Sequence, residues 1–138
     1  MPEKGDKEAL QKAREDIAEG KAPTTAAGEF VREEIHHVRE GKHGARSPKQ
    51  AIAIGLSKAR RSGVPLKPPA KGQAKARTRS SARRAYEVGQ GRRKPRRASA
   101  RRSRAVRAAL KREGRKAASR KALSTQARRA ARRRRTAR

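Results

Sequence analysis

The stretch that decides the fold reads SPKQAIAIGLSKARRSGVP and spans residues 47–65. Ser47 suits the N-cap position, Pro48 suits the first helical turn, and Gln50 completes a capping box. These groups satisfy backbone N–H donors that have no partner at a helix start. The glycine and proline that close the stretch are typical of a helix end. The pattern therefore predicts a helix over residues 48–62.

Apolar residues lie on two sides of this predicted helix. Ile52 and Leu56 share one face, and Ile54 lies on another. We expect the helix to pack between two partners. Gly55, which has no side chain, would let a neighbouring backbone approach closely.

Two further helices are expected before it, over residues 6–19 and 25–40. Apolar residues recur in both at helical spacing. Gly20 and Gly41 follow their last turns and suit C-termini. The expected fold class is therefore all-α, with a small three-helix module in residues 1–63.

The motif KQAIAIGLSKAR at residues 49–60 resembles the signature of a family of short basic bacterial proteins of uncharacterised function. The family pattern reads approximately RKQAIAIALSxA. This chain departs from it at Pro48, where a basic residue is usual, and at Gly55, where Ala is usual. The resemblance spans about residues 28–63. It implies a bacterial source and brings no function or site residues.

Charge divides the chain into two parts of different length. The 138 residues include 42 Lys or Arg and 12 Asp or Glu, for a formal net charge of +30. Residues 1–45 hold 8 basic and 10 acidic groups, whereas residues 46–138 hold 34 basic and 2 acidic groups. A near-neutral head joined to a very basic tail is typical of a nucleic-acid partner.

The tail is expected to lack stable structure by itself. Residues 64–70 form a Pro-rich linker, and residues 71–138 carry 22 Arg and 6 Lys. Ala, Arg and Lys favour helix, but repulsion between like charges opposes it. We therefore expect a largely disordered or conditionally helical tail that becomes ordered on phosphates. By composition the tail resembles those of linker-histone-like bacterial nucleoid proteins.

Arginine can bind phosphate through two parallel hydrogen bonds and inserts into narrow minor grooves. Phe30 and Tyr86 are the sole aromatic residues, so a stacking platform for single strands is disfavoured. Duplex DNA is therefore the favoured partner, with structured RNA as the alternative. The stretch GRRKPRR at residues 91–97 loosely resembles a minor-groove hook. The predicted nucleic-acid-binding residues are Arg83, Arg84, Arg92, Arg93, Lys94, Arg96, Arg97, Arg101, Arg102, Arg104, Arg107, Lys111, Arg112, Arg128, Arg129, Arg132, Arg133, Arg134 and Arg135.

The histidines invite a metal interpretation. Glu33 with His36, and Glu34 with His37, have the i, i+3 spacing of carboxylate-bridged di-iron helices, but such sites need two or more helices. His43 is the one other histidine. We therefore expect polar residues flanking an amphipathic helix, and predict no metal site.

Catalytic residues, cofactors and small-molecule substrates are not predicted either. There is no Cys, no Gly-rich phosphate loop and no pairing of a nucleophile with a base. No apolar run is long enough for a membrane span or a signal peptide.

The expected function is non-enzymatic, mostly sequence-nonspecific DNA binding by a nucleoid-associated or histone-like protein of the bacterial cytoplasm. The tail would neutralise phosphates and compact or bridge duplex DNA, and the helical head is a candidate for self-association. Two alternatives stay open. One is a ribosome- or RNA-associated basic protein. The other is a protein-interaction module that its tail anchors.

Overall fold

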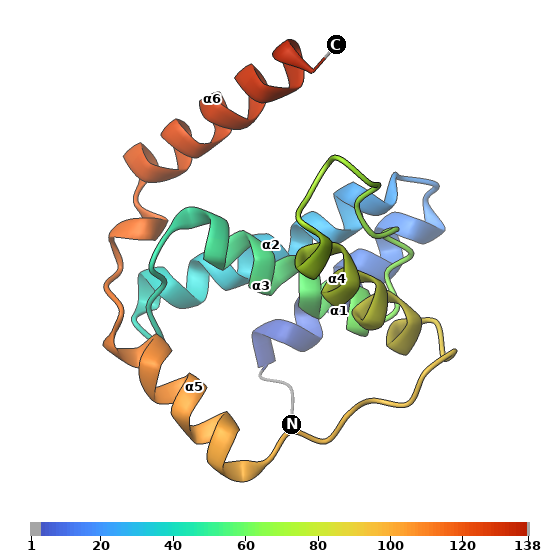
Figure 1. The fold of residues 1–138 in the computed structure, drawn as a ribbon, viewed down its shortest axis with the longest axis horizontal. Coiled ribbons are helices and arrows are strands. Elements are labelled where there is room, and N and C mark those ends of the chain that lie inside the picture. Colours follow the sequence, from blue (N-terminus) through green and yellow to red (C-terminus); the bar gives the residue numbers. More distant parts are fainter. Residues whose placement is uncertain (1–3, 138) are drawn as a thin grey trace. The chain divides into compact units, whose positions relative to one another are not determined.

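The computed structural model describes residues 4–137, and within them the chain is helical throughout its regular structure (Figure 1). Irregular segments join the helices, and the longest of them lie on either side of α4. In chain order the helices are α1 (Lys4–Ala18), α2 (Pro23–Glu40), α3 (Pro48–Arg61), α4 (Ala76–Gly89), α5 (Ala100–Arg112), the 3-10 turn η1 (Lys116–Ala118) and α6 (Arg120–Thr136).

Helix α3 begins where its capping residues place it. The Gln50 N–H donates to Ser47 Oγ at 3.3 Å, as a capping box requires. The Gln50 side chain reaches one residue further back than in the standard motif, and its Oε1 accepts from the Arg46 N–H at 2.7 Å. Helices α1 and α2 overlap the two segments expected before α3.

The expectation of a three-helix module followed by a largely disordered or conditionally helical tail is wrong. Three α-helices and a 3-10 turn occupy most of residues 76–136. Two of them have side-chain N-caps: Ser99 Oγ accepts from the Arg102 N–H at 3.2 Å, and Ser119 Oγ accepts from the Ala122 N–H at 3.1 Å. Repulsion between the arginines does not prevent these helices, because their long side chains extend into solvent and keep their charges hydrated.

The chain divides into two compact units, and both are discontinuous in sequence. The first comprises residues up to Glu33 together with Ala53–Arg97. The second comprises Glu34–Ile52 together with residues from Ala98 onward. Helices α2 and α3 each contribute residues to both units.

The core of the first unit is built mainly from alanines around one aromatic ring. Phe30 is 2% exposed and is the largest side chain of this cluster. The cluster comprises Ala9, Ala13, Ala26, Ala27, Phe30, Ala59 and Val64, with Leu10, Leu56 and Leu66 packed against it. Small side chains let helices approach closely. At Gly55 a Cβ would stand 2.6 Å from the Val31 Cα, which confirms the expected close approach.

Residues from the predicted linker and tail also belong to the first unit. Val64 is part of its core, and Leu66 packs against that core. Ala82 and Ala85 of α4 are also buried. Arg60 is 8% exposed, and its Nε donates to the Leu66 carbonyl at 3.1 Å. Burial lowers the pKa of the Arg60 guanidinium.

The core of the second unit joins residues that lie far apart in sequence. Val38, Ala45 and Ala51 cluster with Ala117 and Ala118, and Ile35 packs against them. The two alanines of η1 therefore supply the apolar surface that covers the end of α2. Helices α5 and α6 bury none of their own residues.

Backbone hydrogen bonds hold the loop before α3 in place within this unit. The Gly44 N–H donates to the Leu110 carbonyl at 2.8 Å, and the Ala45 N–H donates to the Gly114 carbonyl at 3.1 Å. A Cβ on Gly44 would collide with the Glu113 carbonyl, so glycine is required for this approach.

Candidate nucleic-acid interface

The nineteen basic residues predicted to contact phosphate are all exposed. Seven of them, between Arg83 and Arg97, lie in the first unit, and twelve, between Arg101 and Arg135, lie in the second. The structure therefore distributes them over both units.

Helix α6 carries basic residues around most of its axis, and three of them form a continuous row. Arg128, Arg132 and Arg135 are spaced by four and three residues, which places them on one side of the helix. Leu123 and Ala130, half-buried, lie on the opposite side. The row of guanidinium groups therefore faces outward along about two turns.

Helix α5 has the same arrangement. Arg104, Arg107 and Lys111 recur at i, i+3 and i+7 and form a basic side. Val106 and Leu110 lie on another side, and Val106 is 55% exposed. With no buried residue, α5 presents its charges without an apolar cover.

The segment between α4 and α5 has no regular structure and carries the hook-like sequence of residues 91–97. Lys94 and Arg96, together with Arg84 of α4, line a shallow hollow of the first unit that also includes Arg93. The Arg93 Nε donates to Glu87 Oε2 at 3.0 Å. Among the described members of the predicted set, Arg93 alone is held in an ion pair.

Sequence reasoning missed a second basic hollow, in the second unit. Lys116, Lys121 and Arg129 line it together with the hydroxyls of Ser119 and Thr125. Only Arg129 was predicted, because Lys116 and Lys121 each adjoin a single arginine and lie outside the longer basic runs. Their proximity depends on η1 turning into α6, which no local charge pattern indicates.

The aromatic residues are poorly placed for stacking on bases. Phe30 is in the core of the first unit, and Tyr86 is half-buried on α4. An exposed aromatic platform for single strands is therefore absent from residues 4–137.

The histidines depart from expectation. The prediction that these are polar residues flanking a helix is wrong for Glu34 and His37, which are 1% and 2% exposed. His36, one position earlier, does flank α2, and its Nε2 lies 2.7 Å from Glu40 Oε1. His43 closes over the buried pair. The i, i+3 spacing was visible in the sequence, whereas the return of the loop to α2 was not.

Residues 24–72 match a protein family of unknown function (DUF6496). The match agrees with the resemblance to an uncharacterised family, and it supports no function. No curated protein and no solved structure matches the chain. No helix in residues 4–137 is both long enough and apolar enough to span a membrane.

Proposed function

We propose that the protein binds nucleic acid without strong sequence preference and that duplex DNA is its main partner. One observation carries the proposal: nineteen exposed Lys and Arg side chains, eighteen of which are in no ion pair within the described residues. Each phosphate that such a group neutralises releases condensed counterions, and this release drives association. In a bacterial cell, a protein of this kind would be associated with the nucleoid.

Helical structure in the basic region supports this function in a specific way. A disordered segment pays for its ordering when it binds, which reduces affinity. Helices α5 and α6 instead hold their guanidinium groups in outward rows before any ligand is present. Bound phosphates then meet charges that are already positioned.

The division of charge between two units supports bridging of duplexes. The basic residues of α4 and the following segment belong to the first unit, and those of α5 and α6 belong to the second. Each unit has enough cations to hold a DNA segment of its own. We infer that one molecule contacts two segments and so compacts DNA.

Salt-dependent binding to random-sequence duplex DNA tests the proposal. Fluorescence anisotropy should give a log–log slope of affinity against salt near −9 if about ten phosphates are engaged. A single strand and a structured RNA of equal length are measured in parallel. Absence of salt-sensitive binding to any of them at low ionic strength contradicts the proposal. Tighter binding to the RNA than to the duplex would show that RNA, and not duplex DNA, is the main partner.

A further inference from the structure

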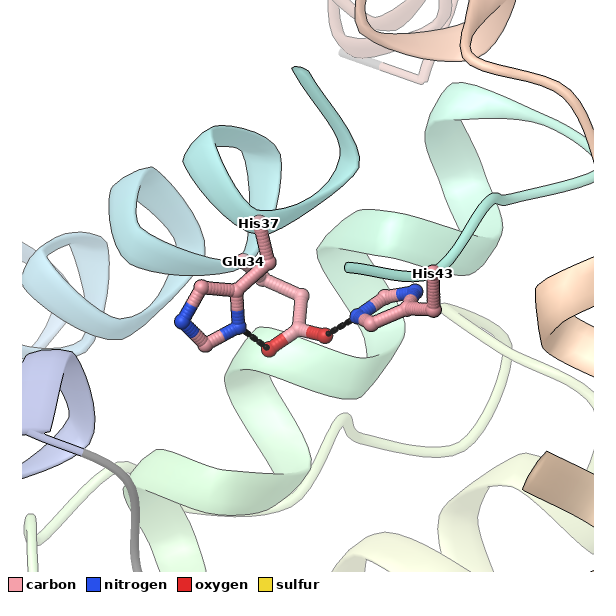
Figure 2. Close-up of side chains that lie close together, drawn as sticks. All are labelled: Glu34, His37 and His43. Atoms are coloured by element: carbon pink, nitrogen blue, oxygen red, sulfur yellow. Dashed lines mark hydrogen bonds and ion pairs between the residues drawn. The ribbon is translucent and has the colours of Figure 1, made fainter. Parts of the chain in front are cut away.

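Three side chains with metal-binding chemistry lie together in the second unit (Figure 2). Glu34 and His37 are one turn apart on α2, and His43 comes from the loop before α3. Their candidate ligand atoms all lie within 4.8 Å of one another. The Glu34 carboxylate stands between the two imidazole rings, whose centroids are 6.1 Å apart.

The end of α2 brings His43 back to the helix. The Lys42 N–H donates to the His37 carbonyl at 3.1 Å, and the Gly41 N–H donates to the Val38 carbonyl at 3.1 Å. This pair of bonds is a Schellman motif. Gly41 has φ +78°, a left-handed conformation that favours glycine. The reversal therefore directs the chain over the final turns of α2.

The hydrogen bond on one nitrogen of His43 sets the role of the other nitrogen. Nδ1 lies 2.8 Å from the Gly44 carbonyl oxygen, which can only accept, so Nδ1 carries the ring proton. Nε2 faces Glu34 Oε1 at 2.6 Å, so this nitrogen and the carboxylate can share a proton or, once they move slightly apart, a metal ion. A backbone carbonyl on the distal nitrogen is also the usual support of a metal-bound histidine.

Burial and geometry both suit a divalent transition metal. Glu34 is 1% exposed and the His43 side chain 17%, and a buried carboxylate is stabilised by pairing or by coordination. Ligand atoms around a tetrahedral zinc lie roughly 3.3 Å apart, given bonds of about 2.0–2.1 Å. The distance from His43 to Glu34 is shorter than this, and the 3.8 Å from His37 Nδ1 to Glu34 Oε2 is longer. Zinc binding would therefore move the first pair of atoms apart and bring the second pair closer together.

We propose that Glu34, His37 and His43 form a site for one divalent ion of the zinc class, with solvent completing the tetrahedron. Two imidazole nitrogens and one carboxylate oxygen are a donor set that zinc accepts. The ion would tie the last turns of α2 to the loop before α3 and stabilise the second unit. This site is independent of nucleic-acid binding.

Metal titration of the full chain, freed of nucleic acid and stripped with a chelator, tests the site. We expect calorimetry with zinc chloride to show one ion bound per chain. His43→Gln should weaken binding by at least about tenfold, the lower limit for loss of even an outer partner. His36→Gln is the matched control, because His36 is next to His37 on α2 but has its side chain 59% exposed. It should leave the affinity unchanged.

The proposal is overturned if folded wild-type protein shows no saturable one-to-one binding. It is equally overturned if His43→Gln binds as tightly as wild type, or if His36→Gln weakens binding as much. Circular dichroism establishes that each variant keeps its helices. If His43→Gln unfolds, X-ray absorption on the zinc-loaded wild type decides the matter. A first shell without imidazole nitrogens at about 2.0–2.1 Å then rejects the site.

Discussion

Gly55 on α3 lies directly against Val31 on α2, where a Cβ would stand 2.6 Å from the Val31 Cα and 2.9 Å from its backbone nitrogen. The obstacle is backbone, which cannot rotate away as a side chain can. This pair sets the distance between the two helices within the first unit.

Gly55→Ala should therefore destabilise the protein, although alanine is the better helix former. Overpacking costs about 1–3 kcal/mol, and the gain in helix propensity offsets up to about 1 kcal/mol. We expect a net loss of about 1–2 kcal/mol in the free energy of unfolding, measured by urea denaturation. Gly28→Ala on α2 is the control, since nothing lies within 4 Å of its Cβ position. It should stabilise the protein slightly. Equal effects of the two variants would show that α2 and α3 are not in this close contact.

Removal of the α6 N-cap tests whether the basic region is folded without a ligand. In Ser119→Ala the Ala122 N–H loses its acceptor, which costs about 1 kcal/mol of helix stability. Hydrogen exchange in the first turns of α6 should become faster in the free protein. Ser103→Ala is the control, because Ser103 lies exposed inside α5 and caps no helix. Hydrogen exchange in α5 of this variant should be unchanged or slower. Exchange at the disordered-chain rate along α6 of the wild type would contradict the helix.

Three substitutions on one side of α6 test the proposed interface. Arg128→Gln, Arg132→Gln and Arg135→Gln together should weaken DNA binding at all sequences alike. They should also reduce the magnitude of the log–log salt slope by about three, roughly one for each lost phosphate contact. Anisotropy against random-sequence duplex gives both quantities.

The control for this variant removes the same charge elsewhere. It combines Lys7→Gln, Lys12→Gln and Arg14→Gln. These three residues lie exposed on α1 and are not among the predicted nucleic-acid-binding residues. We expect a much smaller change in slope. If both triple variants lose the same affinity, net charge alone determines binding and the outward row on α6 has no special role.

The ion pairs of Lys21 lead to a pH prediction. Hydrogen bonds to Asp16, at 2.9 Å, and to Glu19 raise the pKa of the Lys21 ammonium. A raised pKa in the folded state contributes stability that is full below the unfolded value, about 10.4, and is lost as pH rises through the folded value. Lys21→Gln should therefore be less stable than wild type from neutral pH to about pH 10.

Above that range the two proteins should converge. Denaturant titrations at a series of pH values measure this difference, with Lys12→Gln as a control that should follow wild type throughout. A gap between wild type and Lys21→Gln that persists unchanged through the alkaline range would mean that the lysine acts through packing and not through its charge.

Local signals predicted the first helices well, since their cause is local. Ser47 and Gln50 act within one turn, and glycines at 20 and 41 end helices by adopting positive φ. The same holds for Gly55, whose lack of a side chain is visible in the sequence. The exposure of the nineteen predicted nucleic-acid-binding residues is also expected from their charge.

The rest depends on contacts between distant segments. Ala117 and Ala118 look neutral in an arginine-rich sequence, yet they cover Val38 and Ala51. No periodicity shows that they are buried. His43 is likewise an isolated histidine until the turn at Gly41 brings it over Glu34.

The interleaving of the two units has a consequence for synthesis on the ribosome. Residues 34–52 emerge early, but the alanines that complete their core lie at 117 and 118, near the chain end. The part of Val38 that these alanines cover therefore stays exposed while more than sixty further residues are translated. Nor does any single proteolytic cut leave both units whole. A fragment ending before residue 71 would keep the core cluster of the first unit but lack the two alanines that complete the core of the second.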